Sequence, residues 1–213
     1  MPTPRALRNL TQADLTNEVV HFTLRLGPNN DQVDAAITQL DGPARLERIL
    51  QQRRLIAHQV FYDVYGDPVV CFTEATRSGL AQLVTEHRCL PWGLGFSKDF
   101  VFQRGGGPAF YVRGDQWTTF QQQAQSARVL SFATRYWPGS DDPMAADNLK
   151  TDSEYAHERE WRLPCPAAAP TVQFDYGDVR LLVVPSLPGL DRMRAAAPQG
   201  ALDHAEVIIL RAP

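Results

Sequence analysis

Residues 154–164 constrain the fold more than any other part of this sequence, because they combine five charged side chains with two large aromatic ones before the chain turns apolar. In an extended strand, successive side chains point to opposite faces of the sheet. The stretch therefore predicts a strand with two different faces, which carry Glu158, Glu160 and Arg162 on one side and Arg159, Trp161 and Leu163 on the other.

Two carboxylates on one face of a strand repel each other, so the pair Glu158 and Glu160 needs a physical reason. Such a pair suits the binding of a cation, the orientation of sugar hydroxyls, or the stabilisation of a developing positive charge. The alternative is an edge strand that uses its charges to discourage aggregation. The pattern alone favours this second interpretation and leaves the first one open.

Composition and charge restrict the possible classes of protein. The chain has 213 residues, a net charge of -3 and a pI of about 5.9, so it has no global basic field for nucleic acid. Its three cysteines are widely spaced, which predicts neither a disulfide framework nor a zinc site. No signal-peptide core and no run of about 20 apolar residues occurs, so we expect a cytoplasmic protein without a membrane partner.

Hydrophobic periodicity and turn residues predict an α+β fold. We expect strands at 19–26, 68–73, 92–97, 108–113, 172–176, 179–184 and 205–210. Helices are expected at 31–40, 44–53, 78–89, 116–135 and 190–196. Gly105, Gly106 and Gly107 read as a hairpin turn. We therefore predict a single domain over residues 1–213, with early helices packed on mostly antiparallel sheets, a core at about 19–211 and an N-terminal extension at 1–18.

Several polar or aromatic residues on the predicted strands are candidates for a binding site. His21 and Thr23 share a strand face and are able to hold a ligand hydroxyl, although a strand histidine is more often structural. Ser97 ends a strand, where sites tend to be built, and it also suits the N-cap of the next helical turn. Tyr111 could stack on a ring or belong to the core.

Taken together, a set of short segments is similar to a known family. They are Val19-Val20-His21-Phe22-Thr23, Val70-Cys71-Phe72-Thr73-Glu74, Gly93-Leu94-Gly95-Phe96-Ser97-Lys98-Asp99-Phe100, Pro108-Ala109-Phe110-Tyr111-Val112 and His157-Glu158-Arg159-Glu160-Trp161-Arg162. Their order resembles the AbiGi-type proteins of abortive phage-infection systems, over roughly residues 19–165. It also resembles, more distantly, bacterial proteins with a Tyr-x-x-Glu-x-Glu-Trp-Arg strand.

The order of elements is also similar to the ADP-ribosyltransferase fold, and this resemblance implies an activity. In that fold NAD is cleaved at its nicotinamide–ribose bond and ADP-ribose passes to a nucleic acid or protein. The resemblance places a ribose-holding residue at His21 with Thr23, a nicotinamide border at Thr73 or Ser97 with Tyr111, and the catalytic glutamate at Glu160. Glu158 would complete the Glu-x-Glu pair. A carboxylate at this point stabilises charge that exists mainly in the transition state.

Two other functions stay open from the sequence. The chain could be a non-catalytic antitoxin or interaction protein, in which Arg159 and Arg162 neutralise the carboxylates, and a cognate toxin or antitoxin is then its expected partner. It could also be a metal-dependent nuclease that uses His157, Glu158 and Glu160, although this needs a further carboxylate such as Glu74 or Asp99. We expect NAD as a substrate and no bound metal.

Overall fold

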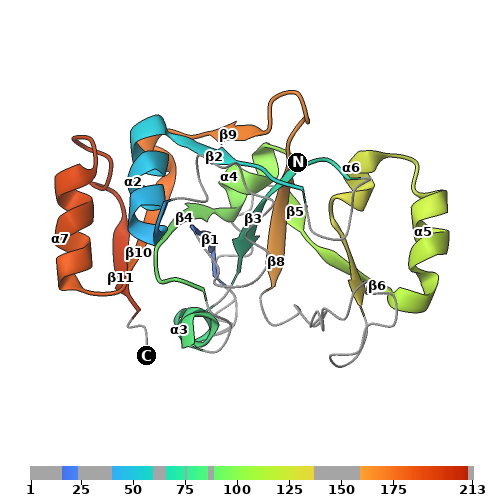
Figure 1. Ribbon diagram of the computed structural model, residues 1–213, viewed down its shortest axis with the longest axis horizontal. Coiled ribbons are helices and arrows are strands. Elements are labelled where there is room, and N and C mark those ends of the chain that lie inside the picture. Colours follow the sequence, from blue (N-terminus) through green and yellow to red (C-terminus); the bar gives the residue numbers. More distant parts are fainter. Residues whose placement is uncertain are drawn as a thin grey trace.

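A seven-stranded sheet runs through the middle of the protein (Figure 1). The computed structural model describes residues 16–23, 40–59, 66–74, 76–85, 89–136 and 159–210. The strand order is β11-β10-β4-β1-β3-β8-β5, and every neighbouring pair is antiparallel except β10 with β11. The strands are β1 (Glu18–Phe22), β3 (Val69–Thr73), β4 (Gly93–Ser97), β5 (Gly107–Pro108), β8 (Glu160–Pro164), β10 (Val179–Val184) and β11 (Glu206–Ile209).

Two smaller sheets and six α-helices complete the described part of the chain. Strand β2 (Arg54–Ile56) pairs antiparallel with β9 (Thr171–Gln173), and β6 (Phe110–Arg113) pairs parallel with β7 (Ala133–Tyr136). The helices are α2 (Gly42–Gln52), α3 (Arg77–Thr85), α4 (Lys98–Gln103), α5 (Trp117–Gln123), α6 (Ala127–Leu130) and α7 (Leu187–Ala196), with 3-10 turns at η3 (Gly114–Gln116) and η6 (Tyr176–Asp178). None of these helices is long and apolar enough to cross a membrane.

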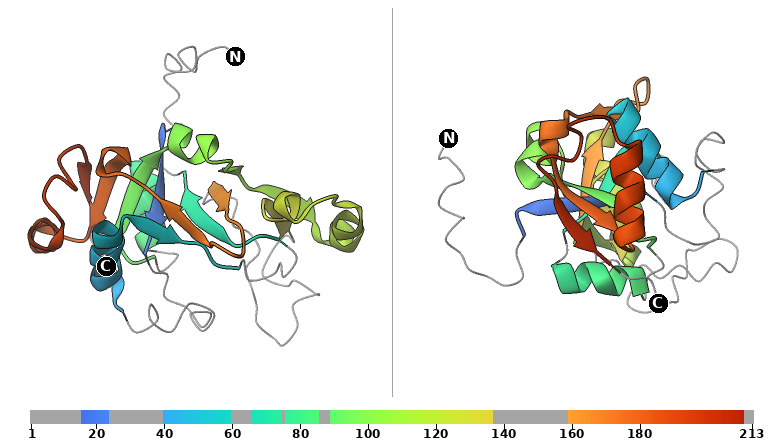
Figure 2. Two further views of the ribbon diagram at one scale, coloured as in Figure 1. Left: turned by 90° about the horizontal axis from the view of Figure 1, so that it is seen from above. Right: turned by 90° about the vertical axis from the view of Figure 1, so that its left-hand side faces the viewer.

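Helices cover both faces of the central sheet, as the right-hand view of Figure 2 shows. Val19 of β1 packs with side chains of α2 and α7, including Leu46 and Met193. Its neighbour Val20 points to the other face and packs with Leu80 of α3. This alternation follows from the period of a strand, and it produces one large core under α2 and α7 and a smaller one under α3.

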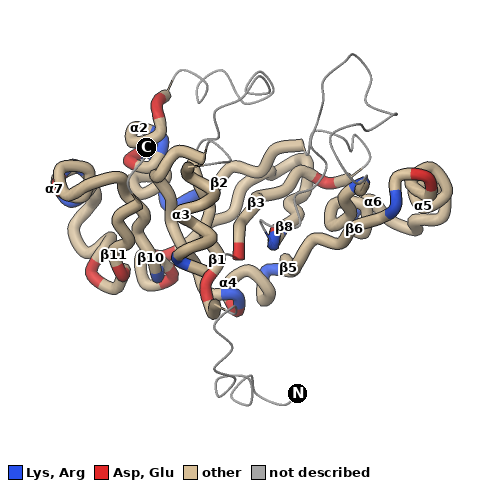
Figure 3. Tube along the Cα trace, turned by 90° about the horizontal axis from the view of Figure 1, so that it is seen from below, with Lys and Arg blue, Asp and Glu red and all other residues tan. Residues whose placement is uncertain are grey.

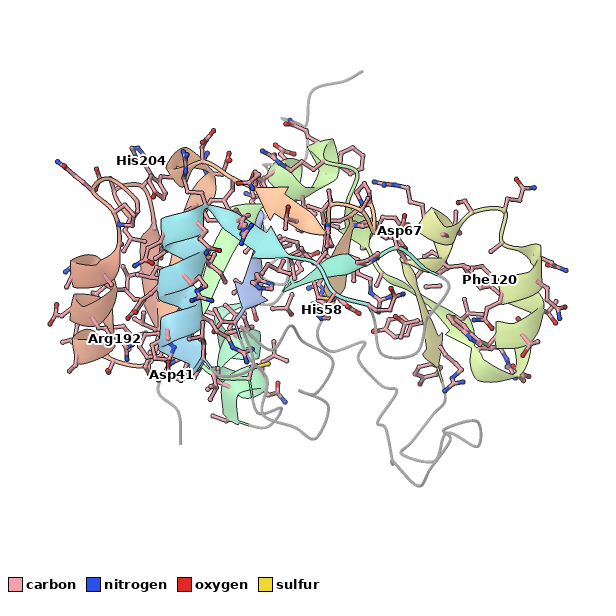
Figure 4. The ribbon with its side chains drawn as sticks, turned by 45° about the horizontal axis from the view of Figure 1, so that its top comes forward. Asp41, His58, Asp67, Phe120, Arg192 and His204 are labelled. Carbon is pink, nitrogen blue, oxygen red and sulfur yellow. The ribbon has the colours of Figure 1, made fainter. Side chains whose placement is uncertain are left out.

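Local signals explain where α2 begins and how it is held. Asp41 is its N-cap, with Oδ1 accepting from the N–H of Ala44 at 2.9 Å, and proline in the first turn suits the helical φ angle. On the exposed side, Arg192 of α7 donates to Glu47 of α2 at 2.6 Å. Figure 4 shows the two helices side by side, with Asp41 and Arg192 labelled.

Residues 110–136 form a separate unit, here called the outer unit, which comprises β6, η3, α5, α6 and β7. It lies at the end of the molecule opposite α7 (Figures 1 and 2). Asp67 and Ser131 tie it to the segment before β3, because Ser131 Oγ accepts from the Asp67 N–H at 2.7 Å. Figure 4 shows Asp67 close to α6.

The prediction of an α+β domain with a mostly antiparallel sheet is confirmed. The single helix predicted at 116–135 is wrong, since the chain leaves α5 after Gln123 and Ser126 caps the separate helix α6. Its last residues form β7, because pairing with β6 overrides their helical pattern. The predicted hairpin turn at 105–107 is also wrong. Gly105, with φ 84°, follows α4 and leads into β5, a conformation that glycine adopts without strain.

Candidate functional site

Strand β8 carries the Glu160-Trp161-Arg162 sequence and lies between β3 and β5. The register pairs Thr73 with Glu160, Phe72 with Trp161 and Cys71 with Arg162. Side chains of paired residues share a face of a sheet. The predicted alternation is therefore observed, with Glu160 and Arg162 on one face and Trp161 on the other.

The guanidinium of Arg162 is buried and uses every hydrogen it has. Nε donates to Glu160 Oε1 and Nη2 to Glu160 Oε2, both at 2.9 Å. Nη2 also donates to Thr134 Oγ1 at 2.7 Å, and Nη1 donates to the carbonyls of Ser131 and Ala133 at 3.1 and 2.9 Å. An arginine side chain has five N–H donors, so this one is saturated.

The pair formed by Glu160 and Arg162 is deeply placed, with side-chain exposures of 13% and 3%. Burial alone would lower the pKa of Arg162, but the nearby Glu160 carboxylate outweighs it and raises the pKa of Arg162 instead. The guanidinium of Arg162 therefore stays charged and bound to Glu160. We call this cluster of Glu160, Arg162, Ser131, Ala133 and Thr134 the arginine joint, because it fastens the outer unit to the central sheet.

Two further predicted site residues lie around the arginine joint. Thr73 is buried and stands directly opposite Glu160 in the register. Tyr111 of β6 stands opposite Thr134 of β7 in the register, and its ring meets that of Tyr136 edge-on, with centroids 6.0 Å apart. Glu160, Thr73 and Tyr111 thus lie in one region of the molecule.

His21 lies on the opposite face of the sheet from Glu160. Its register partner on β4 is Leu94, and its ring packs edge-on against Phe72 with centroids 5.9 Å apart. Strands β1 and β3 pair only at Val20 and Thr73 within the described residues, and the imidazole occupies the next position along the ladder. There Nδ1 donates to the carbonyl of Cys71 at 2.9 Å.

Burial lowers the pKa of His21 to about 4, so the imidazole is neutral near pH 7. A carbonyl only accepts hydrogen bonds, so the proton sits on Nδ1 and leaves Nε2 as an acceptor. His21 thus replaces a main-chain hydrogen bond between two strands. His21 and Glu160 therefore lie on opposite faces of the central sheet.

Thr23 and Ser97 both hydrogen-bond to nearby main chain. Thr23 Oγ1 donates to the carbonyl of Gly42 at 3.1 Å and joins the end of β1 to the start of α2. Ser97 is the N-cap of α4, with Oγ accepting from the Phe100 N–H at 3.1 Å, which is the second of the two roles that the sequence suggested. Glu158, the remaining predicted site residue, lies outside the described residues, as does His157.

A second polar cluster on the Trp161 face was not predicted as a unit. Glu74, just after β3, accepts from Trp161 Nε1 at 2.8 Å, and its Oε1 lies 2.7 Å from Lys98 Nζ. Arg159 Nη2 lies 3.6 Å from the same oxygen. In Figure 3 an acidic position at the end of β3 lies close to a basic position beside β8. We call this set of Glu74, Lys98, Arg159 and Trp161 the tryptophan cluster; Lys98 and Arg159 are 24% and 39% exposed.

His58 is a residue near Glu160 that the sequence did not single out, since 55–65 has no clear pattern. It forms a β-bridge with Val69 beyond the end of β1 (Figure 4). Burial lowers the pKa of His58, and the Glu160 carboxylate partly opposes this shift. A cavity of about 110 Å³ is lined by none of the predicted site residues; its walls are Thr16, Glu18, Val20, Arg77, Leu80, Leu181, Glu206 and Ile208. No group of three potential metal ligands occurs among the described residues.

Comparison with known proteins adds no assignment. No protein-family model, curated protein or solved structure matches this chain.

Proposed function

We propose that this chain is a non-catalytic interaction protein of the antitoxin type, which acts by binding a partner protein. The observation that carries this proposal is the saturation of Arg162, with both oxygens of Glu160 held by its guanidinium. In this role the Glu-x-Glu-Trp-Arg strand is architecture. The resemblance to abortive-infection proteins supplies the biological setting of the proposal, a pair of proteins in phage defence.

The chemistry of glycosidic cleavage supports this choice. A catalytic glutamate must face the sugar on which positive charge develops. Glu160 instead neutralises a buried guanidinium, and removing its charge would leave Arg162 without a counter-ion. The separation of His21 from Glu160 by the sheet supports the same conclusion.

Exposed apolar side chains give the protein surfaces suited to a partner. Phe102 on α4 is 69% exposed, more than any other large apolar side chain among the described residues. Aromatic side chains are enriched at protein interfaces and often supply much of the binding energy. We propose that Phe102 belongs to the partner-binding surface.

The competing function is the ADP-ribosyltransferase activity implied by the resemblance. One observation favours it, namely that Glu160, Thr73 and Tyr111 lie in the same region. The two functions make opposite predictions for a variant that keeps the shape of Glu160 and loses its charge.

Titration with NAD and an assay of nicotinamide release test the proposal on wild type, Glu160→Gln and the control Glu47→Gln. We expect no NAD binding and no nicotinamide release from any of the three. We also expect Glu160→Gln to lower the free energy of unfolding by about 2 kcal/mol, because a buried charge loses its partner. Nicotinamide release by the wild type that disappears in a folded Glu160→Gln variant would overturn the proposal.

The binding role has a test of its own. The product of each neighbouring gene is taken as a candidate toxin and expressed alone and together with this chain, and colony counts report growth. We expect growth inhibition that wild type relieves and Phe102→Lys does not. Relief that is equally strong with Phe102→Lys would remove Phe102 from the partner-binding surface.

A further inference from the structure

The two edges of the central sheet end in different ways. At one edge, β5 has only two residues, and one of them is Pro108. Proline lacks an N–H, so it disfavours pairing with a further strand. At the other edge, β11 has the sequence Glu-Val-Ile-Ile and contains no proline. Its pairing with β10 runs without a register shift from Glu206 to Ile209. Of the two edges, only β11 has no strand paired to its outer side and no proline, as far as the described residues show.

The direction of the main-chain groups on β11 follows from its pairing with β10. Ile209 stands opposite Val184, and the N–H of Leu210 donates to the carbonyl of Val184 at 2.9 Å. In a parallel ladder, the N–H and C=O groups of alternate residues face the neighbouring strand. Those of Ile208 and Leu210 thus face β10, and those of Val207 and Ile209 point away from the sheet.

We propose that β11 pairs with β11 of a second copy of this chain, antiparallel about a two-fold axis at Ile208. This register sets Val207 opposite Ile209 of the second copy, and Ile209 opposite Val207. These are the residues whose main-chain groups point outward, so each pair exchanges both of its hydrogen bonds. The strand is therefore self-complementary, as a two-fold interface requires.

The charge of Glu206 favours antiparallel over parallel pairing of the two β11 strands. Glu206 is the one charged residue of β11, and it forms an ion pair with Arg77 of α3. A parallel stack would place copies of Glu206 side by side, where they repel. The two-fold arrangement puts the two glutamates at opposite ends of the interface. It also covers the side chain of Ile209, which is 41% exposed in one copy.

Sedimentation velocity on the full chain tests the pairing. We expect wild type to sediment as a dimer. Ile209→Lys should give a monomer, because it places a charge in the interface. Val207→Pro should do the same, because it removes an outward N–H and leaves the ladder to β10 intact. Val129→Lys is the matched control, since Val129 is 43% exposed but lies on α6, and it should remain a dimer.

Hydrogen exchange supplies a second readout. The amides of Val207 and Ile209 should exchange slowly in the wild-type dimer and fast in a folded Ile209→Lys variant. A wild type that is monomeric at its highest soluble concentration overturns the proposal. So does a dimer that persists in both folded edge variants.

Discussion

The two faces of β8 hold their charges in different ways. On one face, Arg162 is buried and saturated by five hydrogen bonds. On the other face, the tryptophan cluster leaves Lys98 and Arg159 partly in solvent. The arginine joint connects two parts of the molecule, whereas the tryptophan cluster ties neighbouring strand and helix ends together.

This difference teaches that a charged motif is to be judged by how many of its donors and acceptors remain free. The Glu-Trp-Arg sequence looks like a site because its residues are polar and aromatic. Its arginine has no N–H left for a ligand, and its tryptophan N–H is used by Glu74. On the Trp161 face, by contrast, Lys98 and Arg159 are partly exposed.

Removing the arginine joint should have the largest effect of any single substitution on β8. We expect Arg162→Met to lower the free energy of unfolding by about 3–5 kcal/mol, because Glu160 and the acceptors of the outer unit lose their donors together. Urea denaturation measures this loss. Arg162→Lys, which keeps the charge but not the forked geometry, should recover only part of it. A loss below about 1 kcal/mol would contradict the role of a joint.

The free energy of unfolding should depend on pH because of His21, which lies on the Trp161 face of the sheet. Its folded pKa of about 4 lies below the unfolded value of 6.5. The unfolded chain takes up the proton first as pH falls through this window. Stability conferred by neutral His21 is thus fully present above about 6.5 and is lost toward pH 4. We expect a loss of about 2–3 kcal/mol, measured by urea denaturation across this range.

Two variants sharpen the pH experiment. His21→Gln should flatten the dependence, because the glutamine amide donates to Cys71 without titrating. His204→Gln removes an exposed histidine and should leave the dependence unchanged. Equal slopes in wild type and His21→Gln would contradict the assignment of the titration to His21.

The smallest effects should come from the tryptophan cluster. Trp161→Phe removes the donor to Glu74 and should cost about 1 kcal/mol, because one buried hydrogen bond is lost. Lys98→Met removes a partly exposed ion pair and should cost less, about 0.5 kcal/mol. Thermal melts of both variants test this order. A larger loss in Lys98→Met than in Trp161→Phe would reverse our ranking of the two contacts.

Sequence patterns predicted the strands well where they depend on local alternation. The face assignment of Glu160, Trp161 and Arg162 is confirmed, and the strand predicted at 179–184 has the bounds of β10. Ser97 was also correctly weighed as a helix cap. These features depend on neighbours within a few residues, which a sequence displays directly.

Local sequence patterns could not predict the hydrogen-bond partners of Arg162. Two of its acceptors are main-chain carbonyls of Ser131 and Ala133, about thirty residues away along the chain, and carbonyls carry no sequence signature. The segment that supplies them was taken as one long helix. Missing β7 therefore also meant missing the arginine joint, since the bend after α6 aims these carbonyls at β8.

The position of β8 also sets an order of events during synthesis. Strands β3 and β5 leave the ribosome well before β8, which later pairs with both of them. Translation at roughly 5–20 residues per second leaves the free edge of β3 without this partner for seconds. The nascent chain passes through a stage in which an apolar strand edge is open, and chaperone demand should be greatest then.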